Sequence, residues 1–291
     1  MGIHRSLAFA TCSVLAIGFA RGARAADPDP MLERVVALEK KTEADTTAKS
    51  FDALVGDARA ALTLHRDLEG KDALKDRALA IVGALTKVRQ DDVCRVAFGI
   101  LGEMGDLKGA KYLRPNLRPL DDDKIPLAVE MSVVVAKQLP DDSLVEPLLA
   151  IVDASKNYSL AAKAIEALGS FAAVKSKREK ILTELVKTVQ KSQPGQKGKY
   201  GGGVGSGDGT DGGTPMDGSV SGDGAPGTTS QGKSARWPAL SGPLPDALNR
   251  LTGTVCGSAD EWFATYKEHK SKLSVLFVTD VANKGGKDGA K

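Results

Sequence analysis

An apolar helical pattern recurs along this chain at a spacing of about 35 residues, and no other sequence feature constrains the fold as strongly. The first copy, DDVCRVAFGILGEMGD, spans residues 91–106. Its apolar side chains share one face of a helix: Val93, Val96, Ala97, Ile100, Leu101 and Met104. Further copies lie in residues 128–152 and 161–189. Because one helix pair cannot bury its apolar face alone, neighbouring pairs must stack.

Equivalent positions define the register of this repeat. They lie 35 residues apart between the first and second copies and 32 apart between the second and third: Leu101, Ala136 and Leu168; Met104, Leu139 and Phe171; Leu113 and, in the second copy, Leu148. Residues 78–88 predict the second helix of an earlier unit. Each unit is predicted to be a helix, a short turn and a helix. Aromatic residues make up only 4% of the chain, so the core must be built from Ala, Leu, Val and Ile.

Two helices are predicted upstream of the repeat. The first carries an apolar stripe formed by Met31, Leu32, Val35, Val36 and Leu38. The second covers Phe51 to Leu68, where Gly70 stops it. Residues 26–30, ADPDP, are predicted to be a free leader.

The repeat resembles a known family. CRVAFGILGEMGDLKGAKYLRPNL, residues 94–117, is similar to a HEAT repeat, including the A-x-x-x-L-G-x-x-G-D ending of its first helix. DDSLVEPLLAIV resembles the second helix of such a repeat, with its proline in the first turn, and AAKAIEALGSF resembles a first helix again. The resemblance covers roughly residues 73–191, although Pro126 and the Val133–Val135 run depart from the pattern. It implies an all-α, HEAT-like solenoid of stacked helix pairs over residues 26–191.

The C-terminal region resembles the closing element of HEAT-like arrays in exported bacterial proteins. The residues that carry this resemblance, within residues 237–273, are Leu248, Leu251, Thr252, Gly253, Glu261 and Trp262. The resemblance implies capping helices over residues 234–282 and no active site.

The same region predicts its own helix start and its own apolar seal. Ser258 and Glu261 have the spacing of a capping box. Trp262, Phe263 and Tyr266 supply a large apolar patch at helical spacing, which a terminal repeat needs to close the stack.

A low-complexity segment separates these two parts. Residues 200–227 contain 12 Gly in 28 positions, and residues 192–233 have almost nothing to bury. We therefore predict a disordered Gly/Ser/Asp-rich linker over 192–233 and a disordered tail over 283–291.

Residues 1–25 have the layout of a signal peptide. Arg5 precedes a short apolar run, and Ala23-Arg24-Ala25 forms a small-x-small cleavage pattern before Ala26. An uncleaved membrane anchor is the alternative. Cleavage would place the mature protein in the periplasm, in the cell envelope or outside the cell, with no membrane span. It would also remove three arginines from the 40 basic residues, leaving 37 against 37 acidic residues, so the charge gives no support for nucleic-acid binding.

A phosphate-binding motif occurs by its letters alone. GTTSQGKS, residues 227–234, fits G-x-x-x-x-G-K-[ST], but no strand precedes it and Pro238 follows closely. A helix that began at Lys233 would be broken at once. SVLFVTD, residues 274–280, is the only candidate for a partner strand and lies near the end of the sequence. We therefore predict no nucleotide site.

Three other motifs are interpreted as structural. His65-Arg66-Asp67-Leu68 spells a kinase catalytic-loop signature but lacks the rest of that family's pattern, so we interpret it as a polar helix end. Four aspartates of the Gly-rich segment are interpreted as solubilising charge and not as calcium ligands: Asp208, Asp211, Asp217 and Asp223. Asp121-Asp122-Asp123 is predicted to fill the turn before a helix at Ile125-Pro126, with one aspartate as N-cap. Asn157-Tyr158-Ser159 is a formal glycosylation sequon.

The cysteines and histidines are too few for a metal centre or a catalytic set. Beyond the leader, the chain has Cys94 and Cys256, which we expect to be unpaired small hydrophobic residues, and only His65 and His269. The sequence therefore predicts no catalytic, cofactor-binding or metal-binding residue and no cofactor.

We expect a non-enzymatic exported scaffold or protein-interaction module with an unidentified protein partner. The alternatives are a structural component of a cell-envelope assembly, or a ligand-binding or enzymatic protein with a site in its groove. A deep pocket with paired acids or a Cys–His contact would favour the last of these.

Overall fold

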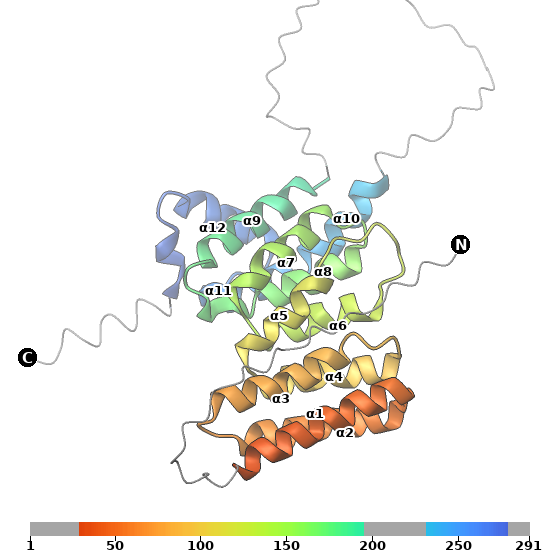
Figure 1. The fold of residues 1–291 in the computed structure, drawn as a ribbon. Coiled ribbons are helices and arrows are strands. Elements are labelled where there is room, and N and C mark those ends of the chain that lie inside the picture. Colours follow the sequence, from red (N-terminus) through yellow and green to blue (C-terminus); the bar gives the residue numbers. More distant parts are fainter. Residues whose placement is uncertain (1–28, 195–230, 279–291) are drawn as a thin grey trace, which may run out of the picture.

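The computed structural model describes residues 29–194 and 231–278, and all regular structure in these two ranges is helical (Figure 1). The elements are α1 (Pro30–Ala48), α2 (Phe51–Asp67), α3 (Asp72–Leu85), α4 (Asp91–Met104), η1 (Leu107–Gly109), α5 (Ala110–Leu113), η2 (Arg114–Asn116), α6 (Leu127–Ala136), α7 (Asp142–Ala154), α8 (Tyr158–Leu168), η3 (Phe171–Ala173), α9 (Arg178–Lys191), α10 (Gln231–Ser241), α11 (Leu244–Thr252), α12 (Ala259–His269) and η4 (Leu273–Leu276). The predicted all-α class is confirmed for these residues. Residues 274–278, once a candidate strand, lie in and after the 3₁₀ helix η4.

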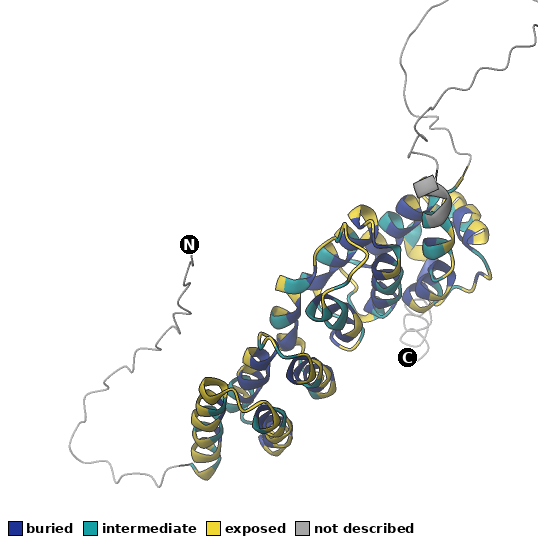
Figure 2. Cartoon of the chain, turned by 90° about the vertical axis from the view of Figure 1, so that its right-hand side faces the viewer, coloured by how far each residue is buried: buried dark blue, intermediate teal, exposed yellow. Residues whose placement is uncertain are grey.

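Alternate helices pack side by side in two layers. In one layer α2 packs on α4, α4 on α6, α6 on α8, and α8 on α10 and α11. In the other layer α1 packs on α3, α5 on α7, α7 on α9, and α9 on α12. Consecutive helices such as α2 and α3, or α7 and α8, join the layers. Figure 2 shows the resulting elongated body, with buried residues turned inward and exposed residues outward.

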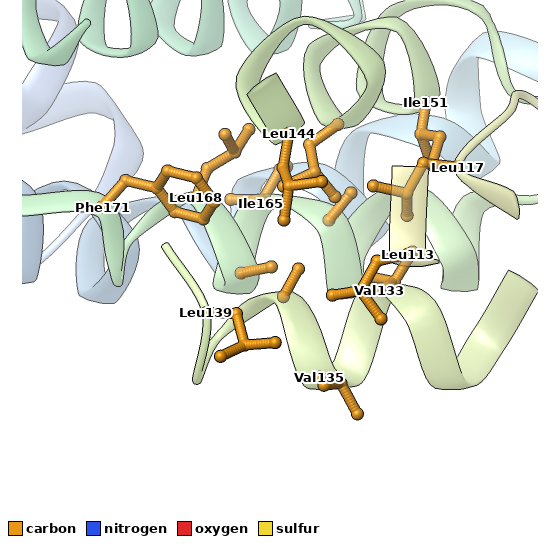
Figure 3. Packing of buried hydrophobic residues seen from close by; sticks show 14 of the residues in the cluster. Leu113, Leu117, Val133, Val135, Leu139, Leu144, Ile151, Ile165, Leu168 and Phe171 are labelled. Atoms are coloured by element: carbon orange, nitrogen blue, oxygen red, sulfur yellow. The ribbon is translucent and has the colours of Figure 1, made fainter. Parts of the chain in front are cut away.

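One hydrophobic cluster fills the space between the layers from α2 to η4, and Figure 3 shows its central part. The residues that the repeat pattern predicts to be core positions are buried there. Equivalent residues of the repeats are fully buried: Leu101, Ala136 and Leu168; Leu139 and Phe171; Leu113 and Leu148. Met104 is half-buried against the same cluster. The 35-residue spacing of the sequence is therefore a spacing of core positions.

Helix α4 shows how local sequence sets the boundaries of one element. The Gln90 side chain accepts a hydrogen bond from the Val93 backbone N–H, at 2.7 Å between Oε1 and N, and so caps the helix. Asp91 and Asp92 occupy the first turn, where the helix dipole favours negative charge. Gly105 ends the helix with φ of 63°, in the left-handed region that glycine adopts at no steric cost.

Two glycines let neighbouring helices of the same layer approach closely. A Cβ atom at Gly102 would lie 1.8 Å from Oε1 of Gln138, and one at Gly169 would lie 2.7 Å from Cα of Ala247. Gly102 ends the α4 pattern and Gly169 follows α8, each directly after a buried leucine. The Leu-Gly pair in both first-helix sequences therefore marks the place where the next helix of the layer crosses.

Polar contacts link residues that lie about one repeat apart. In the layer of α2, Arg66 Nη2 lies 2.6 Å from Glu103 Oε1, and the two residues are 37 positions apart. In the other layer Lys180 Nζ lies 2.5 Å from Glu146 Oε1, 34 positions away. Further pairs of the same kind are Arg77 with Glu39, Lys108 with Asp76, Lys137 with Glu166, Lys163 with Glu130, and Ser176 with Asp142. Each exposed pair contributes little stability. The pairs therefore serve mainly to align neighbouring helices along their length.

The C-terminal helices bury the aromatic residues that the sequence pattern places together. Ser258 Oγ accepts from the Glu261 N–H at 3.2 Å, and Glu261 Oε2 accepts from the Gly257 N–H at 2.7 Å, one residue earlier than in a standard capping box. Trp262 is fully buried, and Phe263 and Tyr266 are buried in the same hydrophobic cluster. The Trp262 indole Nε1–H donates to Asn249 Oδ1 at 3.0 Å, so its polar group is satisfied.

Two sequence predictions about helix limits are wrong. Asp29 and Pro30 do not form a free leader, because Pro30 begins α1 and Asp29 caps it while accepting from Lys71 Nζ at 2.6 Å. The contact with Lys71 lowers the pKa of the Asp29 carboxyl. Likewise α10 begins at Gln231, three residues before the predicted start of the capping helices at 234, and it continues through Pro238.

The prolines inside helices are held by the surrounding contacts. Pro238 removes one backbone donor from α10, but Arg236 Nη2 donates to the carbonyls of Val152 and Asp153, at 2.8 and 2.6 Å, and Leu240 is fully buried. Pro147 lies one turn further into α7 than the family resemblance implies. Residues 1–28, 195–230 and 279–291 lie outside the described residues. They include the predicted signal peptide, most of the predicted linker and the predicted tail.

We expect Gly169→Ala to destabilise the protein by about 1–3 kcal/mol, because the added methyl group meets the backbone of α11 and cannot be relieved by a side-chain rotation. Chemical denaturation of the purified protein measures the change. Gly99→Ala is the matched control, since a Cβ atom there meets no heavy atom within 4 Å. That variant should be stabilised by about 0.5–1 kcal/mol. Equal effects of the two substitutions would contradict the close approach.

Candidate functional site

A pocket of about 760 Å³ is formed by the turn between α3 and α4, by α5 and η2, and by the start of α6. Twelve residues line it: Thr86, Lys87, Val88, Arg89, Asp91, Cys94, Lys111, Tyr112, Pro115, Asn116, Leu127 and Ala128. Its volume falls within the range of about 300–1,000 Å³ that is usual for ligand pockets. Its volume exceeds that of a second pocket described below.

The shape of this pocket depends on the short second helix of the unit. Pro115 ends α5 after four residues, so the wall that a longer helix would fill stays open. The Tyr112 ring lies against Gly83 of α3, where a Cβ atom would come within 2.4 Å of the ring. Gly83 therefore fixes the position of Tyr112 in the pocket wall.

The charge of the lining is positive. Lys87, Arg89 and Lys111 are exposed and form no ion pair in the described part of the chain, and Asp91 is the single carboxylate of the lining. Lys111 Nζ lies 4.9 Å from the Tyr112 ring centroid, a cation–π contact that leaves its donors free.

The first turn of α6 adds backbone donors to the same wall. Its N-cap, Pro126, has no side chain that could accept from the turn, and Leu127 and Ala128 both line the pocket. The first amides of a helix have no partner within the helix and attract negative charge.

Cys94 lies in the pocket wall as a buried thiol. Its Sγ lies 3.8 Å from the Thr86 carbonyl oxygen. Burial, with the negative charge of Asp91 as a smaller cause, raises the pKa of this thiol, while Arg95 opposes the shift. A raised pKa suppresses the thiolate, which is the reactive form. The pocket lining contains no histidine and a single carboxylate, that of Asp91. Neither a Cys–His contact nor a pair of acids is therefore present in this lining.

The three consecutive aspartates lie in the loop before α6, and none of them caps it, which makes that prediction wrong. The physical reason is that the loop is held from the other side. Asn157 Nδ2 donates to the carbonyls of Asp122 and Asp123, at 3.2 and 2.9 Å, and Ser155 Oγ donates to the Leu120 carbonyl at 2.9 Å. The Asp121 side chain faces Lys156 at 3.6 Å.

The glycosylation sequon residue Asn157 is committed to the fold. Its Oδ1 accepts from the Leu160 N–H at 2.9 Å as the N-cap of α8, while Nδ2 holds the aspartate loop, and the residue is buried. In the folded protein this amide is not accessible to modification.

The side chains of the kinase-like tetrapeptide, at the end of α2, lie in different environments. His65 is buried, with Nε2 at 3.6 Å from Asp106 Oδ2. Arg66 and Asp67 are on the surface and pair with Glu103 and Arg34 respectively. The helix-end interpretation is confirmed for Arg66 and Asp67, whereas His65 belongs to the interface between α2 and the α4–η1 turn.

The remaining sequence candidates do not come together in one place. Residues 227–230 of the phosphate-loop motif, and the four aspartates of the Gly-rich segment, lie outside the described residues. Cys94 and Cys256 are both free and buried, as expected. A search of the described residues finds no group of His, Cys, Asp and Glu side chains arranged to hold a metal ion.

A second, smaller pocket of about 350 Å³ lies between α8 and α11 and is lined by Glu166, Pro243, Asp246, Asn249 and Arg250. One polar residue of its lining, Asn249, already has a structural role. Asn249 accepts from the Cys256 N–H and donates to the Cys256 carbonyl, at 3.0 Å each, and it also binds the Trp262 indole. The sequence analysis missed Asn249, because a single asparagine within L-x-x-L-T-G carries no distinct signal.

The basic pocket was also missed by the sequence analysis. A signal for it exists in the alternation of basic with apolar or aromatic residues in Lys87-Val88-Arg89 and in Lys111-Tyr112. Those two segments are 22 residues apart, and only the turn geometry brings them to one pocket.

Within the described ranges, no helix is both long and apolar enough to cross a membrane. A scan of the chain against protein-family models finds no match, and a search of curated proteins finds no significant relative. The functional argument therefore depends on the arrangement of the residues themselves.

We expect Cys94 to react slowly with Ellman's reagent in the native protein and fully after denaturation. A Cys256→Ser variant leaves Cys94 as the only thiol once residues 1–25 are removed. Because the native pKa is raised, the reaction rate should reach half its maximum at a higher pH in the native than in the denatured state. Fast native labelling at pH 7 would contradict the buried thiol.

Proposed function

We propose that this chain is an exported, non-enzymatic scaffold that binds other proteins through a HEAT-like α-solenoid. The observation that carries the proposal is the packing of alternate helices in two layers, with contacts between residues about one repeat apart. In such an array each unit touches mainly its neighbours, and the exposed helices form a long continuous surface for a partner.

The contact pattern supports the solenoid in detail. The linked pairs are separated by 29 to 38 positions, which brackets the repeat length taken from the core residues. Gly102 and Gly169 occur at equivalent places in two units, and each leaves space that a residue of a following helical segment occupies. Repetition of both polar and steric contacts is what an array of similar units requires.

The ends of the array support it as well. A terminal unit must cover one apolar face that has no neighbour. Trp262, Tyr266 and Phe277 concentrate large aromatic side chains on the last unit, in a chain that has few of them. This matches a C-terminal cap of the HEAT-like type.

We propose a non-enzymatic role because of the side chains that line the pocket of about 760 Å³. General acid–base chemistry needs two titratable groups of suitable pKa in contact with the substrate. The lining holds one carboxylate, Asp91, and a thiol whose pKa is raised, and it has no histidine and no second acid beside its lysines and Tyr112. A surface that binds a partner needs neither group.

Site-specific photo-crosslinking in the native cell-envelope fraction tests the proposal. A photoreactive residue would replace Gly99 or Val134, exposed on α4 and α6, or Ala80 or Ala150, exposed on α3 and α7. We expect discrete crosslinked protein bands from positions in one layer and few from the other layer. Absence of any crosslinked protein from all four positions, in a preparation with native helix content, would contradict the scaffold function.

The export part of the proposal has its own measurement. The signal-peptide layout of residues 1–25 predicts that the protein recovered from cells begins at Ala26. Intact-mass spectrometry of the native protein should show this mass. A mass that retains residues 1–25 would instead support the membrane-anchor alternative.

A further inference from the structure

We propose that the pocket between the α3–α4 turn, α5 and the start of α6 binds an extended acidic segment of a partner protein, in which aliphatic residues alternate with carboxylates. This inference rests on the proposed scaffold function and names the chemistry of the partner. It follows from the charge, the apolar surface and the backbone donors that meet in this one pocket.

The basic groups of this pocket differ from those that pair with acidic residues of the neighbouring helix. Arg66, Arg77, Lys108, Lys137 and Lys180 each bind a carboxylate of the neighbouring helix. The pocket cations, Lys87, Arg89 and Lys111, have no such partner among the described residues, although they lie close enough to line a single cavity. Three cations against one carboxylate give the cavity a positive potential that attracts negative charge.

The apolar part of the lining favours a peptide segment over a small inorganic anion. Val88, Leu127 and Ala128 are half-buried, and the half-buried Tyr112 ring extends this surface. The cations come from two separate segments and are exposed at the rim, so they can each meet a different carboxylate. An acidic segment with aliphatic side chains would place its charges at the rim and its apolar groups on this surface.

The backbone geometry agrees with this orientation. The first turn of α6 has no side-chain cap, and its residues Leu127 and Ala128 line the pocket, so a carboxylate or a peptide carbonyl bound there lies at the positive end of a helix. The Tyr112 hydroxyl and the Asn116 amide supply further polar groups in the lining. The pocket thus offers hydrogen bonds as well as charge.

Binding of a defined peptide tests the proposal. The probe is a fluorescein-labelled peptide, Gly-Glu-Leu-Asp-Leu-Glu-Gly, titrated with the full chain and followed by fluorescence anisotropy. We expect saturable binding that weakens as salt is raised, because exposed charge pairs are screened. A peptide with Gln and Asn in place of the acids should not bind. Equal binding of both peptides, or no binding of the acidic one, would overturn the proposal.

A matched pair of triple variants locates the site. The pocket variant is Lys87→Gln with Arg89→Gln and Lys111→Gln, and we expect it to bind the probe about tenfold more weakly. The control variant is Lys40→Gln with Arg59→Gln and Lys191→Gln, which removes the same charge from exposed positions that form no ion pair and do not line the pocket. We expect its affinity to be unchanged. Equal weakening in both variants would show attraction by net charge alone and would overturn the site.

Two further measurements distinguish the ligand chemistry. A probe with serine in place of leucine should bind more weakly, because it loses the apolar contact; unchanged affinity would contradict the alternating segment. Pyrophosphate at the concentration of the probe should not displace it, and full displacement would mark a small-anion site instead.

The two proposals can fail separately. Crosslinked partners that persist in the pocket variant would overturn this inference and leave the scaffold function standing. Absence of crosslinked partners in the wild-type protein would overturn the scaffold function itself, whatever the peptide titration shows.

Discussion

The close crossing of α8 and α11 at Gly169 is a constraint on the two-layer arrangement that no side-chain movement can relieve. The α11 backbone comes so near that any side chain at Gly169 would collide with Ala247. Because a packed interior tolerates little extra volume, this position fixes how closely α11 approaches α8. Ion pairs and buried leucines connect other neighbouring helices of each layer.

The distribution of charge follows from the same packing. Where two long helices of a layer lie side by side, exposed basic and acidic residues one repeat apart come within hydrogen-bonding distance. The unit that contains α5 breaks this regularity, because its second helix ends at Leu113 and is followed by 3₁₀ turns. Lys111 of this unit forms no ion pair in the described part of the chain, and it lines a pocket together with Lys87 and Arg89 of the α3–α4 turn. The cavity and its positive charge thus coincide with the irregular unit.

Much of the fold could be predicted from the sequence because its strongest signals are local. The stripe of α4, the capping role of Ser258 and Glu261, and the burial of Trp262 each depend on spacing within a few residues. The errors concern groups whose partners are distant in sequence. Asp29 is fixed by Lys71, 42 residues away, and the loop of Asp122 and Asp123 is fixed by Asn157.

The position of Pro238 inside α10 could not be predicted for the same reason. Arg236 and Leu240 of the same helix make contacts with residues distant in sequence, and no local rule records these contacts.

The candidate site also depends on contacts between residues distant in sequence. Likewise Lys87 and Lys111 belong to one pocket only after the turn and α5 are folded. Predictions of helix existence rest on periodicity, whereas a site made by two turns depends on tertiary contacts.

The docking of α10 and α11 on the earlier helices has a consequence for how the chain can be divided. Arg236 binds the last carbonyls of α7, Arg250 reaches the Glu166 carbonyl, and Ala247 packs on Gly169, so residues 231–278 are held by contacts across the interface and not by the peptide chain alone. Two separate polypeptides that end and begin around the intervening residues would contain complementary surfaces. The C-terminal part is in this sense an intramolecular ligand whose occupancy depends on its effective concentration.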